Sequence, residues 1–195
     1  MNDILFIIQA RMGSTRLPGK VLRRLGSNRL LDMIVHRVRQ SAFYQKDRDN
    51  LVIATSDKET DDILEAHCVK HGFRVFRGSE ERVLDRFVKV IEAVKPTVVI
   101  RLTGENPFVD PELLDMMIQA HLDQGADYTY ILNTPLDLRR SGQRQAVNRH
   151  QPHSGVGGSI SGACHLICKG SSRSLSRSVF RGAGTISRPS IPADH

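Results

Sequence analysis

Short runs of apolar residues alternate along the first two thirds of the chain with segments in which apolar residues recur every three or four positions. A short apolar run indicates a strand buried on both faces of a parallel sheet, and the longer spacing indicates an amphipathic helix. This pattern predicts five strands, at residues 4–8, 51–54, 74–76, 98–100 and 127–131. It also predicts four helices, at residues 30–38, beyond residue 56, at 83–94 and from 111 to about 124.

Two of the predicted helices have recognisable start signals. Asp110 followed by Pro111 is typical of a helix start, with Asp as the cap and Pro in the first helical position. Ser56 stands three residues before Glu59, which is the spacing of a capping box. For Asp57, beside that box, two interpretations stay open: a helix cap or a residue that binds a ligand.

Strands that alternate with helices call for an α/β fold with a mostly parallel sheet and right-handed crossovers. In such sheets ligands bind beyond the carboxyl ends of the strands. The loops that follow Ile8, Ala54 and Ile100 are therefore the expected ligand-binding loops.

The loop after the first predicted strand, residues 9–20, combines three basic residues with two hydroxyl residues and two glycines. Glycines let backbone N–H groups approach a phosphate, and Arg and Lys supply positive charge. Arg suits bidentate contact with phosphate oxygens, whereas Lys acts as a mobile point charge. A P-loop is excluded, because Val21 stands after Lys20 where that motif needs a hydroxyl residue. The loop still indicates a phosphate-binding site.

Charge divides the chain in two at about residue 138. Residues 1–138 contain 19 Lys and Arg against 20 Asp and Glu, whereas residues 139–195 contain nine against one. The last 57 residues include 11 Ser and 8 Gly and show almost no strand or helix period. We therefore interpret residues 1–138 as a folded domain, and residues 139–195 as a basic segment that we expect to be disordered.

The composition does not indicate a membrane or secreted protein. No apolar run approaches the roughly 18 residues that a membrane span needs. The first run, residues 4–8, follows the acidic Asp3 rather than the basic start of a signal peptide. The chain has three cysteines, too few for a disulfide framework. We expect a cytoplasmic protein with no membrane partner.

Four ordered segments carry a resemblance to a known family. Residues 7–22 match I-I-Q-A-R-M-x-S-T-R-L-P-G-K-V-L almost throughout, and residues 101–111 are similar to R-x-T-G-D-x-P-x-x-D-P. The other two segments are residues 54–61 and 76–87. Together they resemble the sugar cytidylyltransferases, especially the spore coat polysaccharide biosynthesis protein F type and also the 3-deoxy-manno-octulosonate and acylneuraminate enzymes. The resemblance covers residues 4–136.

The resemblance implies a fold, an activity and partners. The fold would be the Rossmann-like, glycosyltransferase-A-like α/β sandwich of nucleotidyltransferases, with its C-terminal part missing or replaced here. The activity would be transfer of CMP from CTP to an acidic sugar or a related precursor of a cell-surface or spore-coat glycan, with release of pyrophosphate. Mg²⁺ would be the cofactor. The partners would be CTP, a sugar-type acceptor and a second copy of the chain in a homodimer.

Residue roles follow from the same motifs. The catalytic residues would be Lys20, with the largest share, and Arg11, which neutralise charge on the α-phosphate and the leaving pyrophosphate. Glu105 would bind Mg²⁺, at a position where the family usually has the shorter Asp. The nucleotide-binding residues would be Ala10, Arg11, Gly13, Ser14, Arg16, Lys20, Ser56, Asp57, Thr103 and Gly104.

Several other polar residues near these motifs, or on the predicted helices, receive no catalytic role. Arg101 has two open interpretations, contact with a phosphate or an ion pair with Asp110. The histidines at predicted helical positions lack metal-ligand partners in the sequence, so we expect them to be structural or exposed. They are His36, His67, His71 and His121.

The resemblance ends at about Leu138, before the region in which family members bind the acceptor and supply a second metal carboxylate. Four interpretations of residues 139–195 stay open: a frameshift, which we favour, a basic arm that binds nucleic acid, a small zinc site, or a flexible segment without a role. The zinc ligands would be His150, His153, Cys164 and Cys168.

The composition of residues 139–195 also bears on activity. We expect the chain to bind CTP weakly and to have little or no transferase activity, because most of the acceptor half is missing. The alternative is a non-enzymatic protein that binds a nucleotide or a nucleic acid through its basic segment. We disfavour a nucleic-acid partner, because the segment lacks interleaved aromatic residues beyond Phe180.

Overall fold

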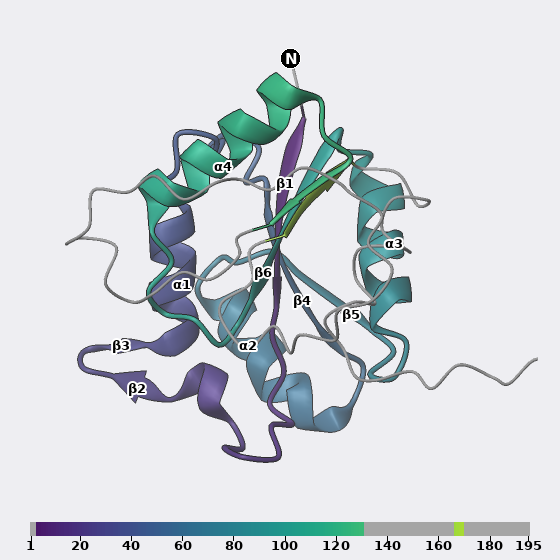
Figure 1. Ribbon diagram of the computed structural model, residues 1–195. Helices are drawn as coiled ribbons and strands as arrows, with labels where there is room; N and C mark the ends of the chain where they lie inside the picture. Colours follow the sequence, from purple (N-terminus) through teal and green to yellow (C-terminus); the bar gives the residue numbers. More distant parts are fainter. Residues whose placement is uncertain (1–2, 131–165, 170–195) are drawn as a thin grey trace, which may run out of the picture.

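Six strands form the central sheet among the residues that the structure describes, which are 3–130 and 166–169 of this computed structural model (Figure 1). The strand order is β5-β4-β1-β6-β8-β7. Four neighbouring strands are parallel: β5 (Val75–Gly78), β4 (Leu51–Ser56), β1 (Ile4–Gln9) and β6 (Val98–Thr103). The predicted α/β fold with a mostly parallel sheet is confirmed.

The other strands are short and antiparallel. β8 (Leu166–Lys169) pairs with β6, and β7 (Tyr128–Tyr130) pairs with β8. Outside the central sheet, β2 (Arg24–Leu25) and β3 (Asn28–Arg29) form a two-stranded ribbon before the first helix. Sequence inspection finds almost no strand period in residues 139–195, yet β8 lies inside that segment and occupies the edge of β6.

Helices cover both faces of the sheet (Figure 1). On one face lie α1 (Leu30–Val38), α2 (Asp62–Lys70) and α4 (Pro111–Gln124), and on the other lies α3 (Val83–Val94). Two short 3₁₀ helices, η1 (Lys20–Leu22) and η2 (Glu59–Asp61), follow the loops after β1 and β4. Between residues 3 and 130, no helix is both long and apolar enough to cross a membrane.

Strand β1 divides the core because its successive side chains point to opposite faces. Phe6 and Ile8 pack in the larger cluster with residues of α1, α2 and α4. Leu5 and Ile7 pack in the smaller cluster, where Phe87 of α3 is fully buried. The run of residues buried on both faces, which predicted a central parallel strand, is confirmed.

The predicted helix signals have different outcomes. Asp110 caps α4, accepting hydrogen bonds from the backbone N–H groups of Glu112 and Leu113. The predicted capping box is wrong, because Ser56 is the last residue of β4 and its hydroxyl donates to Asp61 instead. No side chain caps η2 or α2, so Asp57 does not act as a helix cap either.

Most of the basic segment lies outside the described residues. These include His150, His153 and Cys164, three of the candidate zinc ligands, and also Asp194. The register of β8 is given by its backbone, with Lys169 opposite Val98 and Leu166 opposite Arg101. The boundary at residue 138 and the predicted disorder beyond it stay predictions.

Candidate functional site

The candidate site is built on the carboxyl ends of four adjacent parallel strands. β5 ends at Gly78, β4 at Ser56, β1 at Gln9 and β6 at Thr103. Gln9 is opposite Thr103, and Ser56 is opposite Gly78 in the strand register, so the following loops begin at one edge of the sheet. The loop after β1 runs along the lower edge in Figure 1. The loops that were predicted to bind a ligand therefore share this edge, and their binding of a ligand stays a prediction.

Two ion pairs connect the first loop to its neighbours. Lys20 Nζ lies 2.5 Å from Glu105 Oε1, which belongs to the loop after β6. Arg11 Nη1 lies 3.0 Å from Glu80 Oε1, which belongs to the loop after β5. The Lys20 side chain is 23% exposed and that of Glu105 is 67% exposed. Pairs this open to water contribute little to stability, so an anionic ligand can replace their carboxylates.

The rest of the first loop is folded back on itself. The carbonyl oxygen of Met12 accepts hydrogen bonds from the N–H groups of Ser14 and Gly19, both at 2.9 Å. The Ser14 hydroxyl accepts a long bond of 3.4 Å from the N–H of Leu17. Arg16 is exposed and has no ion-pair partner among the described residues. Within the part of the chain that the structure describes, the loop therefore presents one unpaired cation and two paired ones.

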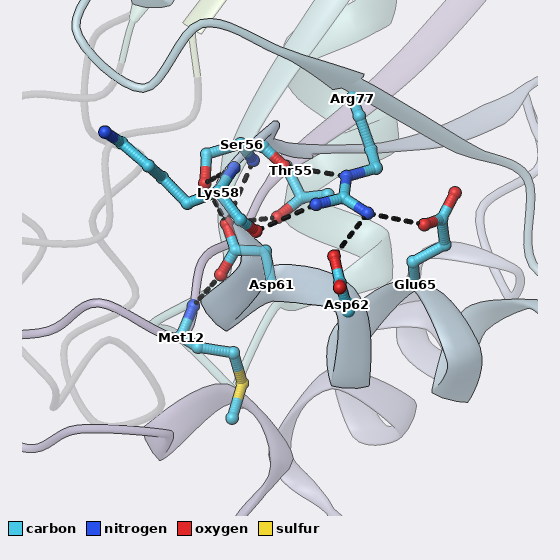
Figure 2. Close-up of polar contacts among 8 residues, drawn as sticks. All are labelled: Met12, Thr55, Ser56, Lys58, Asp61, Asp62, Glu65 and Arg77. Atoms are coloured by element: carbon cyan, nitrogen blue, oxygen red, sulfur yellow. Dashed lines mark hydrogen bonds and ion pairs between the residues drawn. The ribbon is translucent and has the colours of Figure 1, made fainter.

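A buried carboxylate holds the first loop against the end of β4 (Figure 2). Asp61 is 1% exposed, and its Oδ1 accepts the N–H of Met12 at 2.7 Å. Its Oδ2 accepts the Thr55 hydroxyl at 2.9 Å and the Ser56 N–H at 3.0 Å, as well as the Ser56 hydroxyl. Burial alone raises the pKa of Asp61, but the hydrogen bonds from Ser56, Met12 and Thr55 outweigh it and lower that pKa. The carboxylate is therefore ionised and fully engaged.

Arg77 ties the end of β5 to the same region (Figure 2). Its guanidinium donates to the carbonyl oxygens of Ser56 at 3.0 Å and Lys58 at 2.8 Å. It also pairs with Glu65 and Asp62 in the first turn of α2, each at 2.7 Å. The hydrogen bonds to these two carboxylates raise the pKa of Arg77. The second loop is thus fixed from both sides, by Asp61 and by Arg77.

Arg86 is a buried cation behind the exposed pairs. The residue is 1% exposed, and its Nε and Nη1 have no hydrogen-bond partner among the described residues. Burial lowers the pKa of Arg86, and the charges of Asp61 and Arg11 act on it in opposite directions. Arg86 packs directly over Gly78, where an added Cβ would lie 2.5 Å from Arg86 Cγ. Glycine at this position is therefore required by close approach.

The start of the first loop is packed against the loop after β6. The N–H of Gly104 donates to the carbonyl oxygen of Gln9 at 2.7 Å. A Cβ at Gly104 would lie 3.0 Å from both Gln9 O and Ala10 Cβ, so a larger residue would push the two loops apart. Arg101 donates to Gln9 Oε1 at 2.9 Å, which gives its guanidinium a role in the sheet.

The structure brings most of the predicted site residues to this edge. Ala10, Gly13, Ser14 and the basic residues of the first loop lie there together with Thr103, Gly104 and Glu105. Ser56 is buried and its hydroxyl serves Asp61, whereas Asp57 is exposed and its N–H donates to the Gly78 carbonyl at 2.9 Å. Ser56 is therefore engaged within the fold, and a ligand contact by the first-loop residues stays a prediction.

Sequence reasoning missed the residues that position the loop. Asp61, Arg77, Glu80 and Arg86 lie inside the matched motifs but received no role, because their partners are far away in the sequence. The histidines are structural or exposed, as expected, but the premise that they lack potential metal-ligand partners fails for two of them. His67 and His71 lie beside Asp32, so they do have potential metal-ligand partners. Their separation of four residues on one helix was the available signal.

Glu105 has the chemistry of a Mg²⁺ ligand. Mg²⁺ prefers carboxylate oxygens and commonly takes one or two of them, completed by phosphate oxygens and water. Glu105 offers one exposed carboxylate beside the first loop, and among the described residues it belongs to no cluster of three potential ligands. These features fit an ion that a bound phosphate chain helps to hold.

A parallel α/β sheet with a basic, glycine-containing loop at its strand ends is typical of nucleotide-binding folds. Comparison with known proteins defines the class more closely. The family model described as Cytidylyltransferase matches residues 5–149. The chain belongs to the cytidylyltransferase family.

Individual relatives agree with this assignment. The chain is 90% identical over 138 residues to the spore coat polysaccharide biosynthesis protein SpsF of Bacillus subtilis strain 168, covering 71% of this chain and 58% of that protein. A cytidylyltransferase structure from Leptospira borgpetersenii serovar Hardjo-bovis matches with a TM-score of 0.66 at 27% identity, covering 91% of this chain and 63% of that one.

A third relative confirms the fold alone. The structure of CMP:2-keto-3-deoxy-manno-octonic acid synthetase complexed with CTP has a TM-score of 0.58 at 18% identity, covering 90% of this chain and 76% of that one. The chain therefore spans somewhat less than two thirds of the Bacillus and Leptospira proteins.

Proposed function

We propose that this chain carries the CTP-binding half of an enzyme that transfers CMP from CTP to an acidic sugar or a related cell-surface or spore-coat glycan precursor. One observation carries the proposal: the basic first loop is contacted by the segments that follow the other three parallel strands, β4, β5 and β6. These contacts are Met12 with Asp61, Arg11 with Glu80 and Lys20 with Glu105. Membership of the cytidylyltransferase family supports CTP as the nucleotide.

The first loop would bind the triphosphate through its cations. Arg11, Arg16 and Lys20 neutralise negative charge, and the exposed backbone around Gly13 and Ser14 lies close to the phosphates. Since Arg11 and Lys20 are already paired with carboxylates, the phosphates take the place of Glu80 and Glu105 at these cations. This exchange orders the site without a large change of fold.

The same residues would then stabilise the transition state. The acceptor hydroxyl oxygen forms a bond to the α-phosphorus while the bond from that phosphorus to the bridging oxygen breaks. Pyrophosphate leaves with the bonding electron pair, and the hydroxyl proton goes to solvent. Lys20 takes the largest share, because a mobile ammonium follows the charge that develops on the leaving group.

Glu105 would hold Mg²⁺ once the triphosphate is bound. Mg²⁺ supplies charge neutralisation for the phosphate oxygens. Lys20 is the present partner of Glu105, so displacement of its ammonium towards the phosphates leaves the carboxylate free for the ion. If the affinity for CTP does not change when Mg²⁺ is added, Glu105 does not have this metal-binding role.

The acceptor half is the incomplete part of the proposal. The similarity to the Bacillus protein covers 138 residues, and residues 139–195 differ from residues 1–138 in composition. We expect weak CTP binding and little or no turnover. A pyrophosphate-release assay with CTP, Mg²⁺ and a panel of acidic sugars measures this, and turnover at the rate of an intact cytidylyltransferase would contradict it. The homodimer implied by the resemblance stays a prediction, which light scattering would test by measuring the mass of the chain in solution.

Binding is tested by titration calorimetry of the purified full chain with CTP, UTP and ATP, with and without Mg²⁺. We expect CTP to bind most tightly and Lys20→Ala to weaken it by roughly 100-fold, the effect of removing a charged contact to phosphate. Lys46→Ala is the matched control, because Lys46 is exposed in the connection between α1 and β4. Equal weakening by both variants, or no CTP binding at all, would overturn the proposal.

A further inference from the structure

A second cluster of potential ligands lies away from the nucleotide site, between α1 and α2. Asp32 is in the first turn of α1, His67 is in α2, and His71 is at the C-terminal end of α2. One ligand atom from each residue lies within 4.8 Å of the others. No other set of three His, Cys, Asp or Glu residues in the described part of the chain meets this condition.

Hydrogen bonding fixes the state of His71. Its Nδ1 lies 2.8 Å from the carbonyl oxygen of His67, one turn earlier in the same helix. A carbonyl oxygen only accepts hydrogen bonds, so Nδ1 carries a proton, and in the neutral ring that a metal binds Nε2 carries the lone pair. Metal-ligating histidines usually have this arrangement, in which the ring nitrogen that does not bind the metal donates to a backbone carbonyl.

His67 and Asp32 already meet across the two helices. His67 Nε2 lies 2.6 Å from Asp32 Oδ1, and the His67 side chain is 8% exposed. A zinc ion about 2.0–2.1 Å from each ligand would set them about 3.3 Å apart, a separation that a shift of less than about 1 Å in the half-buried Asp32 side chain provides. His67 and His71 stack with ring centroids 4.1 Å apart, so both rings are on one side of α2.

The cluster opens towards solvent. Two neighbouring surface hollows of about 610 Å³ and 430 Å³ share Asn28, Asp32 and Phe73 in their linings, and His71 lines the smaller one. An ion held by three side chains would therefore have an open position for a water molecule or a small anion from solvent. This arrangement is that of an accessible zinc site with three protein ligands.

We propose that Asp32, His67 and His71 bind one zinc ion that links α1 to α2. Two histidines and one carboxylate are ligands that Zn²⁺ accepts readily, and Mg²⁺ does not favour imidazole. α1 follows the first loop of the nucleotide site and α2 follows the second, so the ion fixes the helices behind both loops. Its expected effect is a higher unfolding temperature, independent of CTP.

The test is a Zn²⁺ titration of the metal-free full chain against a chromophoric chelator, repeated with Co²⁺ to record the absorption spectrum. Wild type should bind one equivalent of Zn²⁺. His71→Ala should weaken this binding by at least roughly 100-fold, which exceeds the usual effect of removing a residue that only hydrogen-bonds to a metal ligand. Asp32→Asn should weaken it as well. His36→Ala is the matched control, since His36 is exposed on α1 and lines the larger hollow.

A further variant separates this site from the cysteines and histidines of the basic segment. Cys164→Ser/Cys168→Ser should keep the Zn²⁺ equivalent, and the Co²⁺ spectrum should lack thiolate charge-transfer bands. Thermal unfolding of metal-free His71→Ala should match that of metal-free wild type, which shows that the fold is intact. Loss of the equivalent only in the double cysteine variant, or no Zn²⁺ binding by wild type, would overturn the proposal.

Discussion

The candidate site has two regions that use charge in opposite ways. In the first, which we call the base, charged groups are buried or held by several partners at once. The base consists of Thr55, Ser56, Asp61, Arg77, Gly78 and Arg86. In the second, which we call the rim, charged side chains are exposed or partly exposed and have at most one ion-pair partner each among the described residues. The rim consists of Arg11, Arg16, Lys20, Glu80 and Glu105.

The difference assigns the regions separate tasks. Asp61 accepts four hydrogen bonds and Arg77 contacts four residues, so substitutions in the base should mainly change the free energy of unfolding. Among the described residues, each cation of the rim is paired with one carboxylate or with none, so its substitution should mainly change affinity for an anion. A base variant that changed only anion affinity, or a rim variant that changed mainly the free energy of unfolding, would contradict this division.

Asp61→Asn should have the largest effect on stability. The amide presents N–H donors to groups that are themselves donors, leaving buried hydrogen bonds unmade, and we expect a loss of about 3 kcal/mol in the free energy of unfolding. Urea denaturation measures it. The neighbouring Asp62→Asn, which removes one exposed partner of Arg77, should cost less than about 1 kcal/mol.

The stabilisation by Asp61 should also depend on pH. The pKa of Asp61 is lower in the folded protein than its ordinary value of 3.8, since hydrogen bonds to the carboxylate outweigh its burial. Its contribution is therefore complete above about pH 5 and is lost as the pH falls below the ordinary value through the folded one. Wild type and Asp61→Asn should converge in stability at low pH, and a constant difference between them would contradict this assignment.

Gly78→Ala should have the next largest effect, because the new Cβ would lie 2.5 Å from Arg86 Cγ. Overpacking of this kind costs about 1–3 kcal/mol. Gly13→Ala in the first loop is the matched control, since its Cβ would lie 3.5 Å from Glu80 Oε1, an ordinary contact. Thermal unfolding compares the two variants. Equal destabilisation would contradict the claim that the close approach of Arg86 requires glycine at position 78.

Glu80→Gln should have the smallest effect on stability and a gain in CTP affinity. The substitution frees Arg11 from its carboxylate partner at the cost of less than about 1 kcal/mol of stability. Titration calorimetry should show CTP binding that is roughly two- to fivefold tighter, which corresponds to that free energy. Glu81→Gln, an exposed neighbour, should leave affinity unchanged, and equal gains from both variants would indicate a general charge effect.

Most of the fold and the cations of the rim were predictable from sequence, whereas the long-range contacts of both regions were not, and with them Asp61, Arg77, Glu80 and Arg86 were missed. Helix and strand spacing and the basic first loop are local patterns, visible within about ten residues. The bond from Met12 to Asp61 spans 49 positions and the pair of Lys20 with Glu105 spans 85, and no local pattern specifies such contacts. β8 escaped prediction for a related reason, since a four-residue strand in a Ser- and Gly-rich segment has little pattern of its own, and its place between β6 and β7 is set by distant contacts.

The division between base and rim is tested most directly by the free energy of unfolding of wild type and Lys20→Ala, measured in urea with and without saturating CTP. A ligand that binds only the folded state raises this free energy according to its concentration and dissociation constant. We predict that the two proteins differ by less than about 1 kcal/mol without CTP, and that CTP stabilises wild type much more than Lys20→Ala. Equal stabilisation of both by CTP, or a large loss of stability in Lys20→Ala without it, would contradict the account.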